Sequence, residues 1–166
     1  MGPVALNGVA FRHQAPGFDP LSGEGARIRG GRYNPPESSP VLYLCTSMDC
    51  LLAEFDRLGS KHPAGRSALL PRELYEYKFR FQNVLDLTSA TIRGELSIAV
   101  ADLTTDRWDL CQSLGQAAHA IGFQAVRAPS ATGVGEVLCA FPENIGAGML
   151  IPSLKAVWRH PPSKEA

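Results

Sequence analysis

The sequence lacks the features that would place the protein in a membrane or on nucleic acid. No apolar run approaches the roughly 18 residues that a membrane-spanning helix needs, and no basic segment followed by an apolar stretch opens the chain. There is also no excess of positive charge, because 16 basic side chains balance 16 acidic ones. Proteins that coat nucleic acid or anchor at a membrane surface depend on such an excess. We therefore expect a cytoplasmic protein without direct nucleic-acid binding and without membrane binding.

Several common catalytic and metal-binding motifs are absent as well. The chain contains neither a Gly-x-Ser-x-Gly elbow nor a His-Glu-x-x-His helix. Its four histidines are scattered, and no two of its cysteines have a Cys-x-x-Cys spacing, so we expect no metal. The cysteines lie mostly in apolar stretches, which predicts buried, reduced thiols at Cys45, Cys50, Cys111 and Cys139.

What is present is the composition of a globular domain. With 166 residues, of which 45% are hydrophobic, the chain fits a single domain that buries a core without disulfides. We expect this domain to span residues 1–166, with its core at about residues 8–158 and a frayed tail from His160. The apolar periodicity predicts helices over residues 48–58 and 106–121, and strands over residues 8–13, 41–45, 74–81, 123–127 and 137–141. Because these elements do not alternate regularly, we expect an α+β domain.

Both predicted helices have recognisable ends. Ser47 is a suitable N-cap for the first helix, and Gly59 is a suitable residue to end it. Gly122 would end the second helix in the same way. The second helix carries apolar residues on one face, which we expect to be buried: Leu110, Leu114, Ala117, Ala118 and Ile121.

A glycine-rich segment between residues 23 and 34 concentrates positive charge in this neutral chain. It carries Arg27, Arg29 and Arg32, and a guanidinium group can grip a phosphate with two parallel hydrogen bonds. The segment fits no common nucleotide motif, since no Gly-Lys-Ser/Thr closes it and Ile28 replaces the third glycine of the dinucleotide fingerprint. From these residues alone, a phosphate-binding loop and a solvated loop both remain open.

Three further residues are candidates for chemistry. Glu54 lies at the flank of the apolar stripe of the first predicted helix, so its carboxylate either enters a cleft or is an ordinary surface acid. Tyr43, in the preceding strand, is either a core residue or a platform for a ligand. Ser130 begins a loop between two strands, where its hydroxyl either belongs to a turn or reaches a site at the strand ends.

Taken in order, these segments resemble the RES domain family, the toxin components of RES-Xre toxin–antitoxin modules. The most specific part of the resemblance is the Gly-Gly-Arg-Tyr-Asn block at residues 30–34, followed at a fixed distance by Tyr43 and Glu54. The family is named for an Arg, a Glu and a Ser, which the resemblance places at Arg32 or Arg12, Glu54 and Ser130. The resemblance covers nearly the whole chain and includes Phe11-Arg12, residues 18–26, Val41-Leu42-Tyr43, Ala53-Glu54, Ala117-Ala118, Gly122-Phe123 and Pro129-Ser130-Ala131.

The resemblance implies a fold and an activity. The fold would be similar to that of ADP-ribosyltransferases, with small mixed sheets and flanking helices. The activity would consume NAD by phosphorolysis of its nicotinamide N-glycosidic bond, with inorganic phosphate as co-substrate and nicotinamide and ADP-ribose 1″-phosphate as products. NAD hydrolysis, protein ADP-ribosylation and a non-catalytic nucleotide- or partner-binding module are the alternatives. The implied partner is a cognate Xre-type helix-turn-helix antitoxin, and a homo-oligomer also remains open.

The resemblance also implies roles for individual residues. It assigns catalysis to Glu54, Arg32, Ser130 and Tyr43, and contacts with NAD to Arg12, His13, Arg32, Tyr43 and Ser130. The Glu54 carboxylate would stabilise the positive charge that develops on the ribose, and the arginines would hold the diphosphate or the attacking phosphate.

Two positions depart from the pattern of the family. Tyr33 occupies a position where Trp is common, and Leu138 occupies one where Asn is frequent. The second difference removes one polar group that we would otherwise expect in the site.

Overall fold

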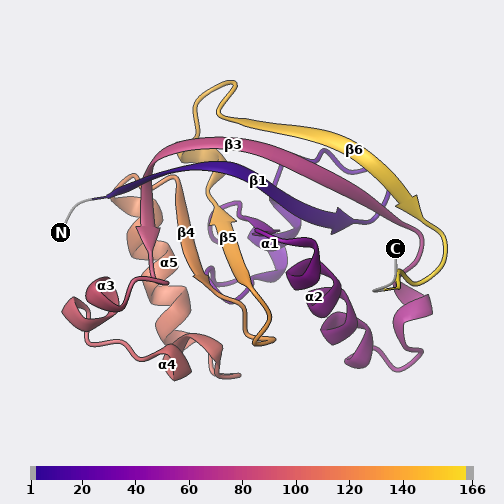
Figure 1. Cartoon of the computed structure of the whole chain (residues 1–166), viewed down its shortest axis with the longest axis horizontal. Helices are drawn as coiled ribbons and strands as arrows, with labels where there is room; N and C mark the ends of the chain where they lie inside the picture. Colours follow the sequence, from indigo (N-terminus) through magenta and orange to yellow (C-terminus); the bar gives the residue numbers. More distant parts are fainter. Residues whose placement is uncertain (1–2, 164–166) are drawn as a thin grey trace.

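The structure is a computed structural model that describes residues 3–163 (Figure 1). Within them six strands form one sheet: β1 (Val4–Gln14), β2 (Leu42–Cys45), β3 (Arg72–Asp86), β4 (Ala125–Pro129), β5 (Glu136–Ala140) and β6 (Leu150–Trp158). The α-helices are α1 (Glu24–Arg29), α2 (Met48–Ser60), α3 (Ala90–Glu95), α4 (Val100–Thr104) and α5 (Asp109–Ala120). Short 3₁₀ helices occupy Arg66–Leu69 and Pro142–Asn144. This mixture of helices and a mixed sheet confirms the predicted α+β class.

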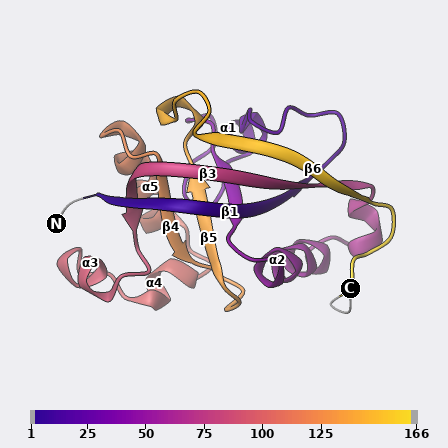
Figure 2. The same cartoon turned by 45° about the horizontal axis from the view of Figure 1, so that its top comes forward.

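The sheet curves so strongly that it closes on itself. Its strand order is β1-β2-β5-β4-β3-β6, and β1 also pairs with β3. Strand β3 has 15 residues, which is long enough to pair with β1 and β6 and then, at residues 84–86, with β4. The pairing of β3 with β4 is parallel and the other pairings are antiparallel. The strands β1, β3 and β6 therefore run together across the shorter β4 and β5, as Figures 1 and 2 both show.

The closed part of the sheet opens between β1 and β2. These two strands share one register pair, Phe11 with Cys45, and then diverge. Residues 15–41, which include α1, form the connection between them. Three residues expected to contact a ligand, namely Arg12, His13 and Tyr43, therefore lie on strand segments next to this divergence.

Side chains alternate along the strands and so separate two hydrophobic clusters. On β2, Leu42 and Leu44 join Tyr77 and Phe79 of β3 in the cluster between the crossing strands. Tyr43 points to the opposite face, where β4 and β5 pack against the segments from α3 to α5. The four cysteines are all buried, as their apolar neighbours predicted.

The five predicted strands are all present, but β1 and β3 extend well beyond their predicted bounds. Strand β6 was not predicted, because it is a strand at the edge of the sheet with Pro152 and several exposed residues, and so has no continuous buried pattern. The short helices α1, α3 and α4 were also missed. Each has at most six residues, which is too short for helical periodicity to be visible.

Helix α2 begins as predicted but ends later. The Ser47 hydroxyl accepts a hydrogen bond from the Cys50 N–H at 3.2 Å, which confirms Ser47 as the N-cap. The prediction that Gly59 ends the helix is wrong, because α2 continues to Ser60. Gly59 is buried and a side chain there would overlap Arg66, so this glycine serves close packing rather than helix termination.

Helix α5 begins at Asp109, three residues after the predicted start, and ends at Ala120, one residue before the predicted end, with Gly122 at a φ of 95° beyond it. The predicted buried face is only partly correct: Ala118 is buried and Leu114 packs against the core, but Leu110 is 42% exposed and Ile121 is 72% exposed. The helix buries its small residues, Cys111, Gly115 and Ala118. A methyl group on Gly115 would overlap the Tyr33 carbonyl, so small residues are needed where α5 approaches the glycine-rich segment.

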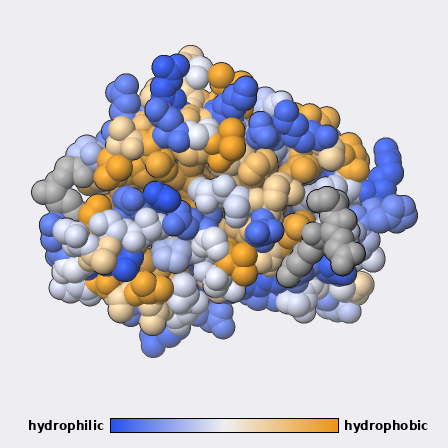
Figure 3. All heavy atoms as spheres, in the orientation of Figure 1, coloured by the Kyte–Doolittle hydropathy of each residue, from blue (hydrophilic) through white to orange (hydrophobic). Residues whose placement is uncertain are grey.

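The surface of the face in Figure 3 mixes hydrophobic and hydrophilic residues, with a hydrophobic band over β1 and β3. None of the helices within residues 3–163 combines the length and the hydropathy that crossing a bilayer would demand. Strand β6 ends at Trp158, just before the predicted frayed tail, and the part of that tail at residues 164–166 lies outside the described residues.

Candidate active site

Glu54 and Ser130 meet although they are 76 residues apart in the chain. Glu54 lies on α2, and Ser130 follows the last residue of β4. The Ser130 hydroxyl donates a hydrogen bond to Glu54 Oε1 at 2.8 Å. Ser130 is 1% exposed, whereas Glu54 is half-buried, so the pair has one buried and one accessible member. The carboxylate of Glu54 therefore enters a site rather than bulk solvent, which was one of the two interpretations of the sequence.

Thr132 holds the Ser130 hydroxyl in place and was missed in the sequence. The two hydroxyl oxygens lie 2.7 Å apart, and Ser130 Oγ also accepts the Thr132 N–H at 3.2 Å. The backbone closes the same turn, because Ser130 N–H donates to the Gly135 carbonyl at 3.0 Å. The Ser-x-Thr spacing is the only signal that the sequence offers for this role, and it is a common turn pattern.

The glycine-rich segment forms a tight turn at residues 31–34. Gly31 and Asn34 exchange backbone hydrogen bonds of 2.8 and 3.3 Å, and Tyr33 and Asn34 are buried. The Tyr43 hydroxyl accepts the Tyr33 N–H at 2.9 Å and donates to Asn34 Oδ1 at 2.6 Å. A side chain on Gly31 would meet this hydroxyl at 2.5 Å. The glycine thus permits the close approach of Tyr43, and burial raises the pKa of the Tyr43 phenol.

The Arg32 side chain extends from this turn to the end of α4 and the loop that precedes α5. Its Nη1 donates to the carbonyls of Leu103, at 3.3 Å, and Thr105, and its Cζ lies 5.6 Å from the centre of the Trp108 ring. Its Nη2 is buried and has no hydrogen-bond partner among the described residues. Arg32 therefore ties the turn to the helices and keeps one unused donor.

Arg32, Tyr43 and Glu54 share a neighbourhood centred on Cys139 of β5. Tyr43 is the register partner of Cys139. Burial raises the pKa of the Cys139 thiol, the Glu54 charge raises it further, and the Arg32 charge lowers it, so both charges lie within electrostatic reach of this thiol. Tyr43 is therefore paired with Cys139, and the charges of Glu54 and Arg32 both act on the thiol of that residue.

Arg12 and His13 lie on β1, on the other side of its divergence from β2. Arg12 Nη1 donates to Gln14 Oε1, and the Gln14 amide in turn donates to the Phe18 carbonyl at 2.8 Å. The His13 ring centre lies 5.2 Å from that of Phe55, the residue after Glu54. His13 therefore packs against the helix that carries Glu54.

Arg72, at the start of β3, was not predicted as a site residue but contacts His13. Its Nε donates to His13 Nδ1 at 3.0 Å. Burial, followed by the Arg72 and Arg12 charges, lowers the pKa of His13 to about 3. His13 is thus a neutral imidazole at physiological pH. Nothing in the sequence around Arg72 distinguishes it from the other arginines, so only the fold reveals this contact.

The burial of Leu138 accounts for one departure from the family pattern, the leucine at a position where asparagine is frequent. Leu138 is fully buried among Leu42, Leu44 and the other members of the cluster between the crossing strands. The side chain therefore belongs to the core and adds no group to the Glu54 neighbourhood.

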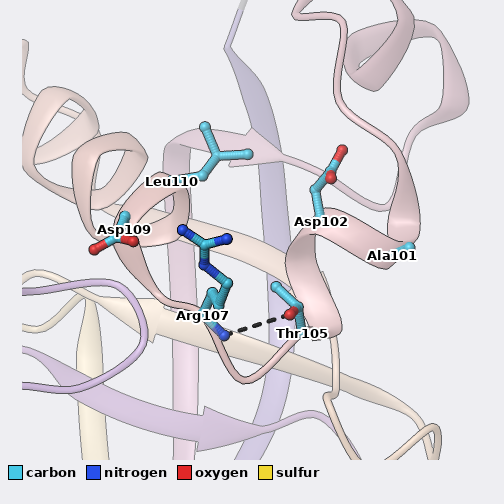
Figure 4. A pocket seen from close by; sticks show the side chains of 6 residues that line it. All are labelled: Ala101, Asp102, Thr105, Arg107, Asp109 and Leu110. Atoms are coloured by element: carbon cyan, nitrogen blue, oxygen red, sulfur yellow. Dashed lines mark hydrogen bonds between the residues drawn. The ribbon is translucent and has the colours of Figure 1, made fainter.

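A separate hollow of about 530 Å³ lies between α4 and α5 (Figure 4). It is lined by Ala101, Asp102, Thr105, Arg107, Asp109 and Leu110. None of the predicted site residues lines it. We therefore do not place the chemistry there. Within residues 3–163, no group of three or more histidine, cysteine or acidic side chains is arranged to hold a metal ion.

The fold and these contacts define a class of protein: a small α+β domain in which a carboxylate on a helix accepts a hydrogen bond from a serine hydroxyl at the end of a strand. The family model described as RES domain matches residues 7–161, and the chain belongs to this family.

Two kinds of relatives agree with this assignment. The chain is 32% identical over 156 residues to the NAD(+) phosphorylase MbcT of Mycobacterium tuberculosis and of Mycobacterium bovis, covering 90% of this chain and 81% of each relative. The crystal structure of the M. tuberculosis MbcT–MbcA toxin–antitoxin complex has a chain that superposes with a TM-score of 0.81 at 31% identity. That superposition covers 95% of this chain and 86% of the other.

Proposed function

We propose that this protein is an enzyme that degrades NAD by phosphorolysis and releases nicotinamide and ADP-ribose 1″-phosphate. The observation that carries the proposal is the Glu54–Ser130 hydrogen bond of 2.8 Å. The similarity to a protein named NAD(+) phosphorylase supports it. The substrates are NAD and inorganic phosphate.

The bond that breaks joins the ribose to the nicotinamide ring. Its electron pair moves to the ring nitrogen, which loses its positive charge, and positive charge develops on the ribose instead. A fixed carboxylate close to this charge lowers the barrier. The Ser130 hydroxyl engages Glu54 Oε1 and leaves Oε2 without a partner among residues 3–163, available to accept a ribose hydroxyl. An oxygen of the phosphate then forms the new bond to the same carbon.

The neighbouring residues would bind and orient the dinucleotide. The unused Nη2 of Arg32 is suited to an acceptor oxygen of the substrate. Tyr43 acts by holding the turn that carries Arg32, because its hydroxyl is already engaged at 2.9 and 2.6 Å. Arg12 and His13 would contact the substrate from β1. Since nicotinamide leaves as a neutral molecule, the reaction needs no second carboxylate as a general acid.

Antitoxin binding is the second part of the proposal. The relative of known structure was crystallised as a toxin–antitoxin complex, which supports an antitoxin partner for this chain. We infer that the partner is of the Xre helix-turn-helix type and covers the connection between β1 and β2. This connection exposes apolar side chains, with Phe18 at 63% and Ile28 at 56%. A partner there would block access to the site.

The enzyme is tested by incubating the purified protein with NAD, with and without inorganic phosphate, and identifying the products by chromatography and ³¹P NMR. We expect nicotinamide and ADP-ribose 1″-phosphate only when phosphate is present. Free ADP-ribose would assign hydrolysis, and a labelled protein band from labelled NAD would assign protein ADP-ribosylation. Unchanged NAD in both incubations would contradict an NAD-degrading enzyme.

The role of Glu54 is tested by Glu54→Gln, which keeps the shape and removes the charge. We expect kcat to fall by about 100-fold or more, the usual loss when a group that stabilises developing charge is removed. Glu95→Gln changes an exposed carboxylate on α3 in the same way and should leave kcat unchanged. Equal rates for the wild type and the Glu54 variant would refute the assignment.

A further inference from the structure

Several arginines form no ion pair within residues 3–163, and Arg12, Arg29 and Arg72 are among them. Arg27, Arg57, Arg66 and Arg127 each form an ion pair. In contrast, Arg12, Arg29 and Arg72 have no carboxylate oxygen within 4.0 Å among the described residues. Arg12 and Arg72 are also partly buried, unlike the exposed Arg80 and Arg107. Partly buried cations without a counter-charge are uncommon in a stable fold.

These arginines lie close enough to repel one another. Burial lowers the pKa of Arg72, and the charges of Arg12 and then Arg29 lower it further. The same two strand arginines, Arg72 and Arg12, depress the pKa of His13. No acidic residue is among the causes of either shift. The repulsion thus persists in the protein without a ligand, and an anion would relieve it.

The side chains around this charge are held in place. The Arg72 Nε–H donates to His13 Nδ1 at 3.0 Å, so the proton of the neutral imidazole lies on Nε2. The ring is packed between Phe55, at 5.2 Å, and Trp158, at 5.7 Å. On the other face of β1, the 4% exposed Gln14 fixes Arg12 and is itself fixed by the Phe18 carbonyl. Such a fixed arrangement of donors is typical of a binding site rather than of solvated surface charge.

The donor chemistry specifies the ligand. A guanidinium group presents parallel N–H donors that fit two oxygens of one phosphate, and several such groups together compensate a dianion. Arg72 uses Nε for His13 and keeps both terminal nitrogens free of partners within residues 3–163. A carboxylate ligand would occupy fewer of these donors than a tetrahedral phosphate.

We propose that Arg72 and His13 form a phosphate-binding cluster on one face of β1, in which Arg72 binds the phosphate group and positions the His13 imidazole. The positive charges of Arg12 and Arg29 would add to the attraction of the anion. The proposal rests on the proposed NAD phosphorolysis and adds Arg72 to its site. The bound group is either the attacking inorganic phosphate or the diphosphate of NAD. Both groups offer phosphate oxygens to the same donors, and steady-state kinetics distinguishes between them.

The test compares Arg72→Gln and Arg72→Lys with the wild type. Arg80→Gln is the matched control, since Arg80 is an exposed arginine on the same strand. Calorimetric titration with inorganic phosphate, and separately with ADP-ribose, measures binding without turnover. Steady-state kinetics then gives KM for NAD and KM for phosphate. We expect Arg72→Gln to weaken the binding of one of the two ligands by about 10-fold or more, because a charged hydrogen bond is lost. Arg72→Lys keeps the charge and should recover part of the loss.

The direction of the effect identifies the source of the phosphate. A higher KM for phosphate with an unchanged KM for NAD assigns the cluster to the attacking phosphate, and the reverse assigns it to the diphosphate. A fall in kcat with both KM values and both binding constants unchanged overturns the proposal. The titrations measure binding without turnover. If the protein does not degrade NAD, the proposed function is contradicted, and the titrations still test whether the cluster binds phosphate. Circular dichroism of each variant establishes that it is folded.

Discussion

Arg32 and Arg72 differ in what their side chains already hold. Arg32 donates from Nη1 to the carbonyls of Leu103 and Thr105 and lies over the ring of Trp108, so its side chain is held by the protein. Arg72 donates once, to His13, and faces two other cations. We therefore expect Arg32 to stabilise the fold around the site, and Arg72 to contribute little stability in the absence of a ligand. The difference teaches that the partners of an arginine, rather than its presence in a glycine-rich loop, indicate where an anion binds.

The turn that carries Arg32 depends on its contact with α5, and breaking that contact should have the largest effect. Gly115→Ala places a methyl group on the Tyr33 carbonyl, so the helix or the turn must move. We expect a loss of about 3 kcal/mol in the free energy of unfolding, since overpacking a rigid contact costs about 1–3 kcal/mol or more. Urea unfolding measures it. Gly94→Ala is the control, because nothing lies within 4 Å of that added methyl, and it should not destabilise the protein.

Replacing Arg32 and Arg72 one at a time tests directly whether the two arginines differ in their contribution to stability. Arg32→Gln loses charged hydrogen bonds to two carbonyls and should lower the free energy of unfolding by about 2 kcal/mol. Arg72→Gln removes a repelled charge and should change stability by less than about 0.5 kcal/mol in the absence of phosphate. Thermal unfolding of both variants in a buffer without phosphate measures the difference. Equal losses of stability would show that the two arginines have the same structural role.

The sequence predicted the elements that carry the site better than the contacts between them. Helix α2, its Ser47 cap and the strands β2 and β4 follow from local periodicity and capping, and these elements position Glu54 and Ser130. The family resemblance, rather than any spacing, named that pair. Because the two residues are 76 positions apart, no local signal in the sequence indicates that their side chains meet.

The predictions from the sequence failed where the role of a residue depends on packing between distant segments. Leu110 was wrongly assigned to the buried face of α5 because hydrophobicity ranks it above Gly115, whereas the close approach to Tyr33 requires the absence of a side chain. Arg72 was missed for a related reason. Its significance comes from β1 and β3 lying side by side, where Arg72 can reach His13. No property of residues near Arg72 in the chain reports that pairing.

The neutral His13 beside Arg72 predicts a loss of stability in acid. The folded-state pKa of about 3 lies below the usual value of 6.5, so between these values the unfolded chain binds a proton that the folded protein does not. Stability should therefore fall as the pH decreases from about 6.5 towards 3. His13→Gln removes this contribution and should reduce the loss between pH 7 and pH 5 by about 1–2 kcal/mol.

Urea unfolding at both pH values measures this difference. His62→Gln, at an exposed histidine, should leave the pH dependence unchanged. If the His13 variant loses as much stability in acid as the wild type, His13 is not the neutral, cation-flanked group described above.

We expect the smallest effect from replacing Arg27. This variant tests whether the difference between paired and unpaired arginines also holds within the glycine-rich segment. The Arg27 Nε lies 2.6 Å from Glu24 Oε2, but the two side chains are 40% and 52% exposed. Solvent screening leaves such a pair with less than about 0.5 kcal/mol. Arg27→Gln should therefore leave the free energy of unfolding and both KM values almost unchanged. Arg29→Gln, two residues away, should raise a KM, because Arg29 has no carboxylate partner among residues 3–163 and its charge reaches Arg72. A higher KM in the Arg27 variant as well would mean that the net charge of the segment, rather than the position of individual guanidinium groups, attracts the phosphate.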